Sequence, residues 1–201
     1  MSKILYIKAN AKPEGESRTF KIADAFMEAY RQAHPDDPIT TLDLCKEKIG
    51  FLTADDLAAV FGAKTSESRS HPILKYAYQF AESDKYVVAE PMWNLNIPAI
   101  LKAYIDYVSV VGITFKYTEQ GPVGLLSGKK TVNIVSRGGD YQSEPFNSFE
   151  MGDRYLRTIF GFFGISDYTT IAAEKLDVVG QDVNAIVEKA AQDARNLAKN
   201  F

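Results

Sequence analysis

Short apolar segments with the composition of β-strands alternate with longer amphipathic segments along nearly the whole chain. Strands are predicted at residues 4–9, 38–44, 85–91, 130–136 and 167–173. Helices are predicted at residues 17–33, 53–62, about 72–82, 97–111, 148–163 and 181–199. This alternation predicts an α/β fold in which helices connect the strands of a parallel sheet.

One predicted helix is marked more clearly than the others by a single stripe of apolar residues. The stripe consists of Ile97, Ile100, Leu101, Tyr104, Ile105, Val108 and Val111. Asn96 is the expected cap of this helix, and Pro98 lies in its first turn, where proline is tolerated. The aromatic segment that follows, residues 113–118, is expected to be a loop.

A chain of 201 residues, 46% of them hydrophobic, is long enough to bury one sizeable core. No repeat, low-complexity segment or linker divides it, so residues 1–201 are predicted to form a single domain. We expect a three-layer sandwich around a five-stranded parallel sheet. The pattern does not fix the strand order, but 2-1-3-4-5 is common among doubly wound sheets of this size and is the expected order.

The charge pattern excludes two classes of partner. The net charge is −3 and the basic residues are scattered, so neither a nucleic acid nor an anionic membrane is expected to bind. No apolar stretch approaches the roughly 20 residues needed to span a bilayer. Cys45 is the only cysteine and cannot form an internal disulfide, which favours a reducing, cytoplasmic setting.

Histidine is scarce, and this restricts the possible chemistry. The two histidines, His34 and His71, each precede a proline and are expected in loops or at a helix start. They supply too few ligands for a zinc site, so no metal is predicted. A nucleophile activated by histidine would have to recruit one of these two loop residues, which disfavours hydrolytic chemistry.

The expected strand order locates the functional site. Ligands of such sheets bind at the carboxyl ends of strands 1, 3 and 4. These ends lead into residues 9–19, 90–97 and 136–145, which we call the first, second and third loops. Their convergence on one cleft is a stronger indication than any one loop alone.

The first loop places two hydroxyl groups, Ser17 and Thr19, at the start of a helix. Unpaired backbone N–H groups and the helix dipole favour a phosphate there, and Arg18 adds a positive charge. The alternative is that Ser17 serves only as a helix cap. The loop has neither the dinucleotide-binding glycine pattern nor the P-loop pattern, which disfavours both of those classes.

The second and third loops favour a flat ligand. An exposed Trp93 at a strand end would contact such a ligand, and the Asn94 amide and backbone N–H groups would bond its edge; alternatively, Trp93 folds beneath the next helix. Gly138 and Gly139 permit positive φ and a close approach of the backbone to a ligand, or else form an ordinary tight turn. Cys45 is expected to lie far from the three loops and to be inert.

Four segments, in order, carry a resemblance to a known family: PMWNLNIPAILKAYIDYV, GITFKYTEQGPVGL, SRGG and FGFFGI. Their sequence and spacing resemble the FMN-dependent NADH-azoreductases, members of the flavodoxin-like quinone reductase group, over nearly the whole chain. The resemblance implies a flavodoxin-like fold with bound FMN, NADH or NADPH as the electron donor, and a homodimer with each flavin at the subunit interface.

The resemblance also implies which residues bind. For the FMN phosphate it indicates Ser17, Arg18 and Thr19, with Asn10 nearby where relatives often carry serine. For the flavin ring it indicates Met92, Trp93, Asn94, Leu95, Ser136, Arg137, Gly138 and Gly139. Tyr117 and Phe162 are implied to help form the wall of the substrate site.

The resulting hypothesis is a cytoplasmic flavoprotein oxidoreductase in which hydride moves from the nicotinamide to FMN N5. A quinone or azo compound then enters the same slot, which makes the kinetics ping-pong, and no catalytic side chain is required. The alternative is a flavodoxin-like electron carrier without NADH-dependent turnover, although −3 is a modest charge for docking. A signalling receiver domain ranks last, because the third strand ends in Glu90 and Pro91 rather than in a phosphoacceptor aspartate.

Overall fold

A computed structural model describes residues 1–13 and 15–201 of the chain. Its central sheet is parallel throughout and has the order β2-β1-β3-β6-β7. The strands are β1 (Ile4–Lys8), β2 (Ile39–Asp43), β3 (Lys85–Pro91), β6 (Lys130–Ser136) and β7 (Asp167–Ala173). The predicted α/β class and the order 2-1-3-4-5 of the core strands are confirmed.

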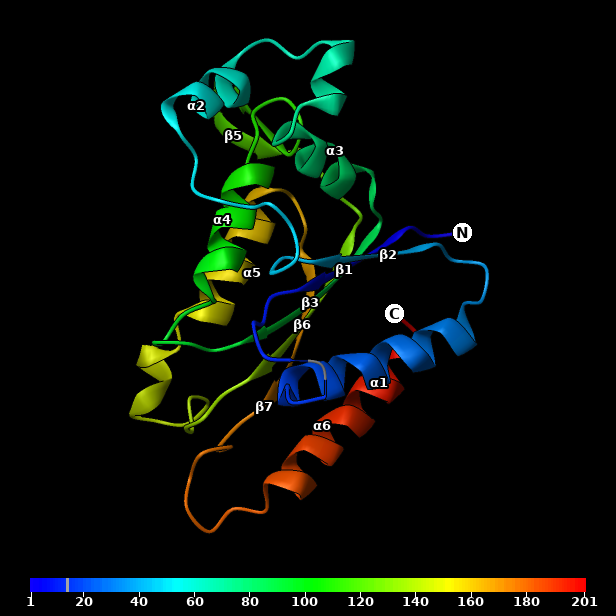
Figure 1. Ribbon diagram of the computed structural model, residues 1–201, viewed down its shortest axis with the longest axis vertical. Helices are drawn as coiled ribbons and strands as arrows, with labels where there is room; N and C mark the ends of the chain where they lie inside the picture. The colour runs from blue at the N-terminus through cyan, green and yellow to red at the C-terminus, as the bar shows by residue number, and fades with distance from the viewer. Residues whose placement is uncertain (14) are drawn as a thin grey trace.

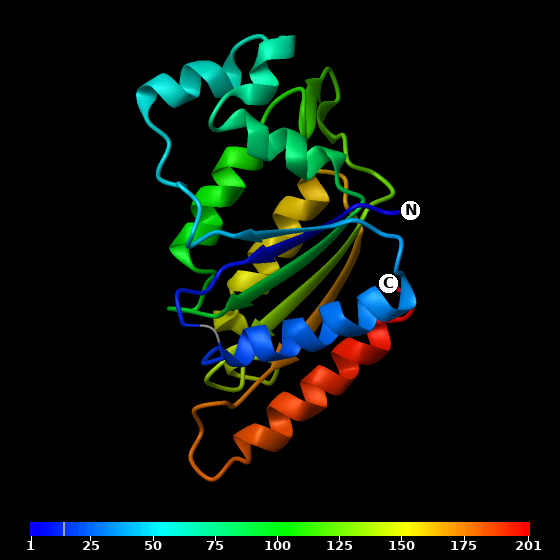
Figure 2. The same ribbon diagram turned by 45° about the vertical axis from the view of Figure 1, so that its right-hand side comes forward.

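Helices cover both faces of the sheet and make three layers (Figures 1 and 2). On one face lie α1 (Arg18–Ala33) and α6 (Val183–Ala198), packed side by side. The other helical segments are α2 (Ala54–Phe61), η1 (Ser66–Ser70), α3 (Leu74–Glu82), α4 (Ala99–Val108), η2 (Phe146–Phe149) and α5 (Gly152–Phe162). In the described ranges, no helix combines the length and apolar character needed to cross a membrane.

Two apolar clusters lie on either side of the sheet because successive strand residues point to opposite faces. In β1, Leu5 and Ile7 are buried against the layer of α3, α4 and α5. Ile4 and Tyr6, which alternate with them, are buried against α1 and α6. The central strand β1 is thus apolar on both faces, as expected for a parallel sheet covered by helices.

The start of α4 differs from the prediction. Asn96 is not the cap: Pro98 occupies the N-cap position and the helix begins at Ala99. The Asn96 side chain instead accepts a hydrogen bond from the Ile97 N–H (2.8 Å). The helix ends at Val108, so Val111 lies outside it.

The helix predicted at residues 148–163 is also shorter than expected. Residues 146–149 form the separate 3-10 turn η2, and α5 begins at Gly152. The carboxylate of Glu150 accepts hydrogen bonds from the N–H groups of Asp153 (2.8 Å) and Arg154 (3.3 Å). These bonds satisfy first-turn donors, so they fix the helix start.

A hairpin of β4 (Phe115–Thr118) and β5 (Gly121–Gly124) occupies the segment expected to be a loop. Its strands are short, and β5 is rich in glycine and proline, which are poor strand formers. Tertiary packing decides the structure here: a Cβ at Gly124 would lie 2.2 Å from the backbone of Phe163 and Gly164. Only glycine allows the hairpin to approach the end of α5 so closely.

Candidate functional site

Ser17 fulfils both roles that its position in the sequence allows. It is the N-cap of α1, with its Oγ accepting a hydrogen bond from the Phe20 N–H (3.1 Å). The same oxygen accepts a bond from Nδ2 of the buried Asn10 (2.8 Å). Since the oxygen acts as acceptor in both bonds, the hydroxyl proton is not committed and can be donated to an anion.

A second hydroxyl pair ties the first loop to the third. Oγ1 of the buried Thr19 lies 2.6 Å from Oγ of Ser136. Only one proton is used between these two oxygens, so the other is free. Among the described residues, the backbone N–H groups of Arg18 and Thr19 have no acceptor, as at any helix start. The beginning of α1 therefore presents several donors, the arrangement that binds phosphate groups.

Arg18 connects this helix start to the segment after β7. Its Nη1 donates to the carbonyl of Leu176 (3.0 Å) and to Oδ1 of Asp177 (2.8 Å). Lys12 and Arg137 line the same cleft, so its lining holds three cationic side chains and one carboxylate, that of Asp177. Sequence reasoning missed Lys12, Leu176 and Asp177. The strand order could have indicated Leu176 and Asp177, because the carboxyl end of β7 lies on the same side of the sheet as the three loops.

The second loop contains a tight turn in an unfavourable backbone conformation. Trp93 and Asn96 exchange backbone hydrogen bonds (2.9 and 3.0 Å), and the residues between them, Asn94 and Leu95, have φ values of 50° and 69°. Two successive positive φ values define a type I′ turn, which costs about 1 kcal/mol or more for leucine. The turn leaves Trp93 41% exposed, so the predicted exposed tryptophan is confirmed and the alternative of burial beneath the helix is wrong.

The paired glycines of the third loop are needed for a different reason from the one predicted. Neither Gly138 nor Gly139 has a positive φ, so that expectation is wrong. A Cβ at Gly138 would lie 2.5 Å from Oδ2 of Asp177, and one at Gly139 would lie 3.0 Å from the ring of Tyr141. In the part of the chain that the structure describes, the N–H groups of both glycines have no acceptor.

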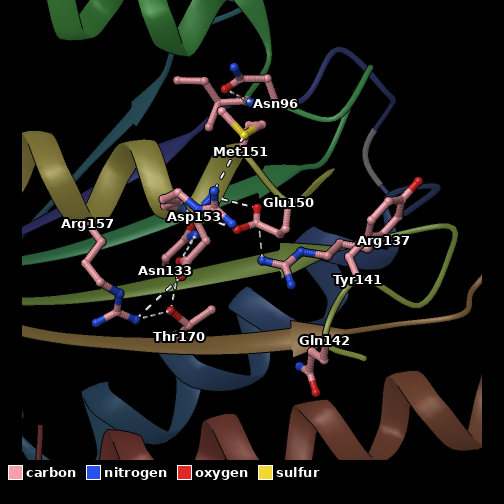
Figure 3. Close-up of polar contacts among 12 residues, drawn as sticks. Asn96, Asn133, Arg137, Tyr141, Gln142, Glu150, Met151, Asp153, Arg157 and Thr170 are labelled. Atoms are coloured by element: carbon pink, nitrogen blue, oxygen red, sulfur yellow. Dashed lines mark hydrogen bonds and ion pairs between the residues drawn. The ribbon is translucent and has the colours of Figure 1, made fainter. Parts of the chain in front are cut away.

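Arg137 is buried, and its guanidinium is engaged by two carboxylates, of which Figure 3 shows that of Glu150. It pairs with Glu174 (2.6 Å) and with Glu150 (3.3 Å). Glu174 also accepts a hydrogen bond from the N–H of Tyr141 (2.8 Å). The side chain of Arg137 therefore anchors the third loop to the end of β7 and to the start of α5.

Two cavities at the carboxyl ends of the strands are both lined by Trp93. The smaller, of about 140 Å³, is lined by residues of all three loops together with Leu176 and Asp177, so the loops converge on one cleft as expected. The larger, of about 740 Å³, has a size typical of small-molecule sites and extends past Asn94 toward Tyr155. Of the predicted cofactor residues, the linings of these cavities lack only Ser17, Leu95 and Gly139.

Cys45 is not far from the loops, and that expectation is wrong. It is exposed and lines the larger cavity together with Trp93 and Asn94. Partial burial and the nearby carboxylate of Asp43 raise the pKa of the Cys45 thiol, which favours the protonated, less nucleophilic form.

Tyr117 and Phe162, the predicted substrate-wall residues, line neither of these cavities. Both contact Phe115, with ring centroids 5.6 Å and 4.7 Å away, on the hairpin and at the end of α5. The hairpin and the end of α5 lie near the amino ends of the strands, where β7 begins (Figures 1 and 2). The cleft is lined by residues at the opposite, carboxyl ends of the strands. The amino and carboxyl ends of a strand of seven residues, such as β6, lie roughly 20 Å apart. Neither residue reaches the cleft of its own chain.

Fold and cleft together define a doubly wound α/β protein whose cleft lies where the strand order reverses, between β1 and β3. The sequence pattern of the family described as having the flavodoxin-like fold matches residues 2–198. The chain belongs to this family.

The comparisons with individual proteins confirm the resemblance to flavin-dependent reductases. The chain is 64% identical, over 100% of both chains, to the FMN-dependent NADH:quinone oxidoreductase of Clostridium beijerinckii. The crystal structure of the azoreductase from Bacillus anthracis strain Sterne superposes with a TM-score of 0.90 at 36% identity, covering 100% of both chains. The FMN-dependent NADH-azoreductase of B. anthracis strain Ames Ancestor, solved in complex with FMN, gives a TM-score of 0.89 at 28% identity, with coverage of 100% and 99%.

Proposed function

We propose that this protein is an FMN-dependent oxidoreductase that takes hydride from NADH or NADPH and reduces quinones and azo compounds. The observation that carries the proposal is the donor cluster at the start of α1, placed beside a cleft that all three loops line. Relatives that match the whole chain are named FMN-dependent NADH:quinone oxidoreductases, in agreement with this assignment.

The donors at the helix start fit a singly phosphorylated ligand. We assign the FMN phosphate to Ser17, Arg18 and Thr19, where free hydroxyl protons, two N–H groups and a cation are gathered. Asn10 contributes by orienting the Ser17 hydroxyl. Lys12 supplies a second positive charge at the same cleft.

The second and third loops fit the ring. Among the described residues, the N–H groups of Asn94, Leu95, Gly138 and Gly139 have no acceptor, whereas those of Met92 and Trp93 are used within the protein. We assign the unpaired N–H groups to the polar edge of the flavin, where main-chain donors favour negative charge. Trp93 provides the adjoining aromatic wall.

When bound, FMN supplies the two-electron chemistry at its N5 atom, and the chain binds and orients the reacting molecules. Neither histidine lies in the lining of the two cavities. His34 contacts Tyr30 at the far end of α1, with ring centroids 4.5 Å apart. The role left to the protein is to hold donor and acceptor in turn against the ring and to exclude water.

The larger cavity favours an enzyme over an electron carrier. A carrier exchanges electrons through surface contact and needs no slot for a substrate. Beside Trp93 this chain has a cavity of about 740 Å³, which suits a nicotinamide or a quinone.

With NADH and a quinone varied together, the FMN-loaded enzyme is expected to give parallel double-reciprocal lines, because donor and acceptor occupy one slot in turn. Initial rates of NADH oxidation at several fixed quinone concentrations provide the measurement. Intersecting lines would contradict the shared slot. Absence of any quinone-dependent NADH oxidation would favour the electron carrier.

We further propose that the working form is a homodimer and that residues 1–201 act as one FMN-binding domain in the cytoplasm. Tyr117 is 68% exposed. Like Phe162, it belongs to a segment near the amino ends of the strands, opposite the cleft. If these two residues form the substrate wall, they do so in the cleft of the partner subunit. The single exposed cysteine agrees with a reducing compartment.

The dimer predicts a mass in solution of twice the 22.4 kDa of the chain, measured by light scattering during gel filtration. Replacing Tyr117 by alanine is expected to raise KM for the quinone while leaving FMN bound. A monomer that turns over quinone at the full rate would contradict the proposed arrangement.

A further inference from the structure

Glu90 is a buried carboxyl group that lines neither of the two cavities. It precedes Pro91 at the end of β3 and is 1% exposed. Among the described residues, neither of its carboxyl oxygens has a hydrogen-bond partner. Strand alternation places it on the same face as Val88, toward the layer of α4 and α5.

The charged and titratable groups around Glu90 come from several elements. They are Arg137 in the third loop, Glu150 before α5, Asp153 in α5 and Tyr168 in β7. The neutral amide of Asn133 on β6 is also close. The buried residues of α4 include no acidic or basic side chain.

These surroundings offer little compensation for an ionised Glu90. The guanidinium of Arg137 is already shared by Glu150 and Glu174. The nearby Asn133 amide stabilises an ionised Glu90 only in part, because it already donates to Asp153 (2.9 Å). A further buried negative charge would have to share both this amide and the Arg137 cation with other carboxylates, which is unfavourable.

Burial, opposed by Asn133 and Arg137, raises the pKa of Glu90 to about 8. The carboxyl group is therefore protonated at neutral pH and ionises in a mildly alkaline range.

The position of Glu90 connects this group to the candidate ring site. Two residues further along, Met92 lines the cleft, and its N–H bonds the carbonyl of Ser136 (2.9 Å). Arg137, whose charge acts on Glu90, lines the same cleft. Only the end of β3 separates the carboxyl group from the cleft.

We propose, on the basis of the proposed function, that Glu90 couples the uptake of one proton to reduction of the bound flavin. It acts through its charge and is therefore a positioning residue. Reduction by hydride adds negative charge to the ring, which disfavours a second negative charge behind the second loop. The Glu90 carboxylate then takes a proton from solvent and forms an O–H bond; both electrons come from the nicotinamide.

The sign of the coupling follows from linkage. Below about pH 8, Glu90 is protonated whether the ring is oxidised or reduced, so no extra proton is taken up. Above that pH it is ionised beside the oxidised ring and regains its proton on reduction. The equilibrium constant for reduction therefore falls by a further tenfold for each pH unit, until Glu90 is ionised in both states.

The test compares the FMN-loaded wild-type protein with Glu90→Gln, which remains neutral at every pH. The flavin midpoint potential is measured from about pH 6 to pH 10, and infrared spectra follow the protonated carboxyl band over the same range. The control is Glu188→Gln on the exposed face of α6, where the replaced carboxylate pairs with Arg195.

We expect a steeper fall of the potential above about pH 8 in the wild type and in Glu188→Gln, and no such break in Glu90→Gln. The infrared band should be present at neutral pH, disappear at alkaline pH and be missing from Glu90→Gln. A wild-type potential without the break, or a wild-type protein without the band, would overturn the proposal even if Glu90→Gln fails to fold. A chain that retains no FMN would instead contradict the proposed function, and this inference with it.

Discussion

Arg137→Met is expected to lower the free energy of unfolding by about 3–5 kcal/mol, because it leaves buried carboxylates without their cation. The side chains of Arg137, Glu150 and Glu174 are only 4%, 12% and 11% exposed. Methionine has a similar length and fills the space, so the loss reports the unpaired charges rather than a cavity. Urea denaturation of the two proteins at neutral pH provides the measurement.

The matched control is Arg157→Met. The guanidinium of Arg157 also pairs with an acid, Asp153 (3.5 Å), but its side chain is 51% exposed. The Asp153 carboxylate is only 13% exposed, but it keeps hydrogen bonds from Asn133, Tyr168 and Thr170. Losing a half-exposed cation should therefore cost much less stability than losing Arg137. Equal losses in the two variants would contradict the anchoring role of Arg137.

Ser17→Ala is expected to weaken FMN binding by about 10- to 100-fold, because it removes a hydrogen bond donated to a charged group. The affinity is measured from the quenching of the emission of Trp93, the single tryptophan, as FMN is added to the stripped protein. Its position beside both cavities predicts strong quenching in the wild type.

Two comparisons separate phosphate binding from helix capping. Thr53→Ala removes the side-chain cap of α2 and should cost a similar stability, about 1 kcal/mol, without changing the affinity for FMN. Riboflavin lacks the phosphate, so Ser17→Ala should bind it as well as the wild type does. An equal loss of affinity for riboflavin would contradict the assignment of Ser17 to the phosphate.

The fold was largely predictable because the strands are short apolar runs and the helices keep a regular apolar stripe. Each predicted strand is present in the sheet, and Ser17 caps α1 where expected. The errors arose where individual contacts, and not the periodic pattern, decide the local structure. The start of α5 depends on the Glu150 carboxylate, and the β4–β5 hairpin depends on the fit of Gly124 against Phe163.

The site was predictable to the level of its loops but not of its contacts. Topology brings the ends of parallel strands together, so the three loops could be named in advance. The pairing of Arg137 with Glu174 and of Thr19 with Ser136 joins residues far apart in the chain. No local pattern indicates such pairs, nor the burial of Glu90 without a hydrogen-bond partner.

A crystal structure of the protein with FMN tests the central claim most directly. The phosphate is expected within hydrogen-bond distance of the Ser17 hydroxyl and the Thr19 N–H. The polar edge of the ring is expected at the unpaired N–H groups of Asn94 and Gly138. FMN bound elsewhere, or bound in this cleft with its phosphate pointing away from the start of α1, would contradict the account.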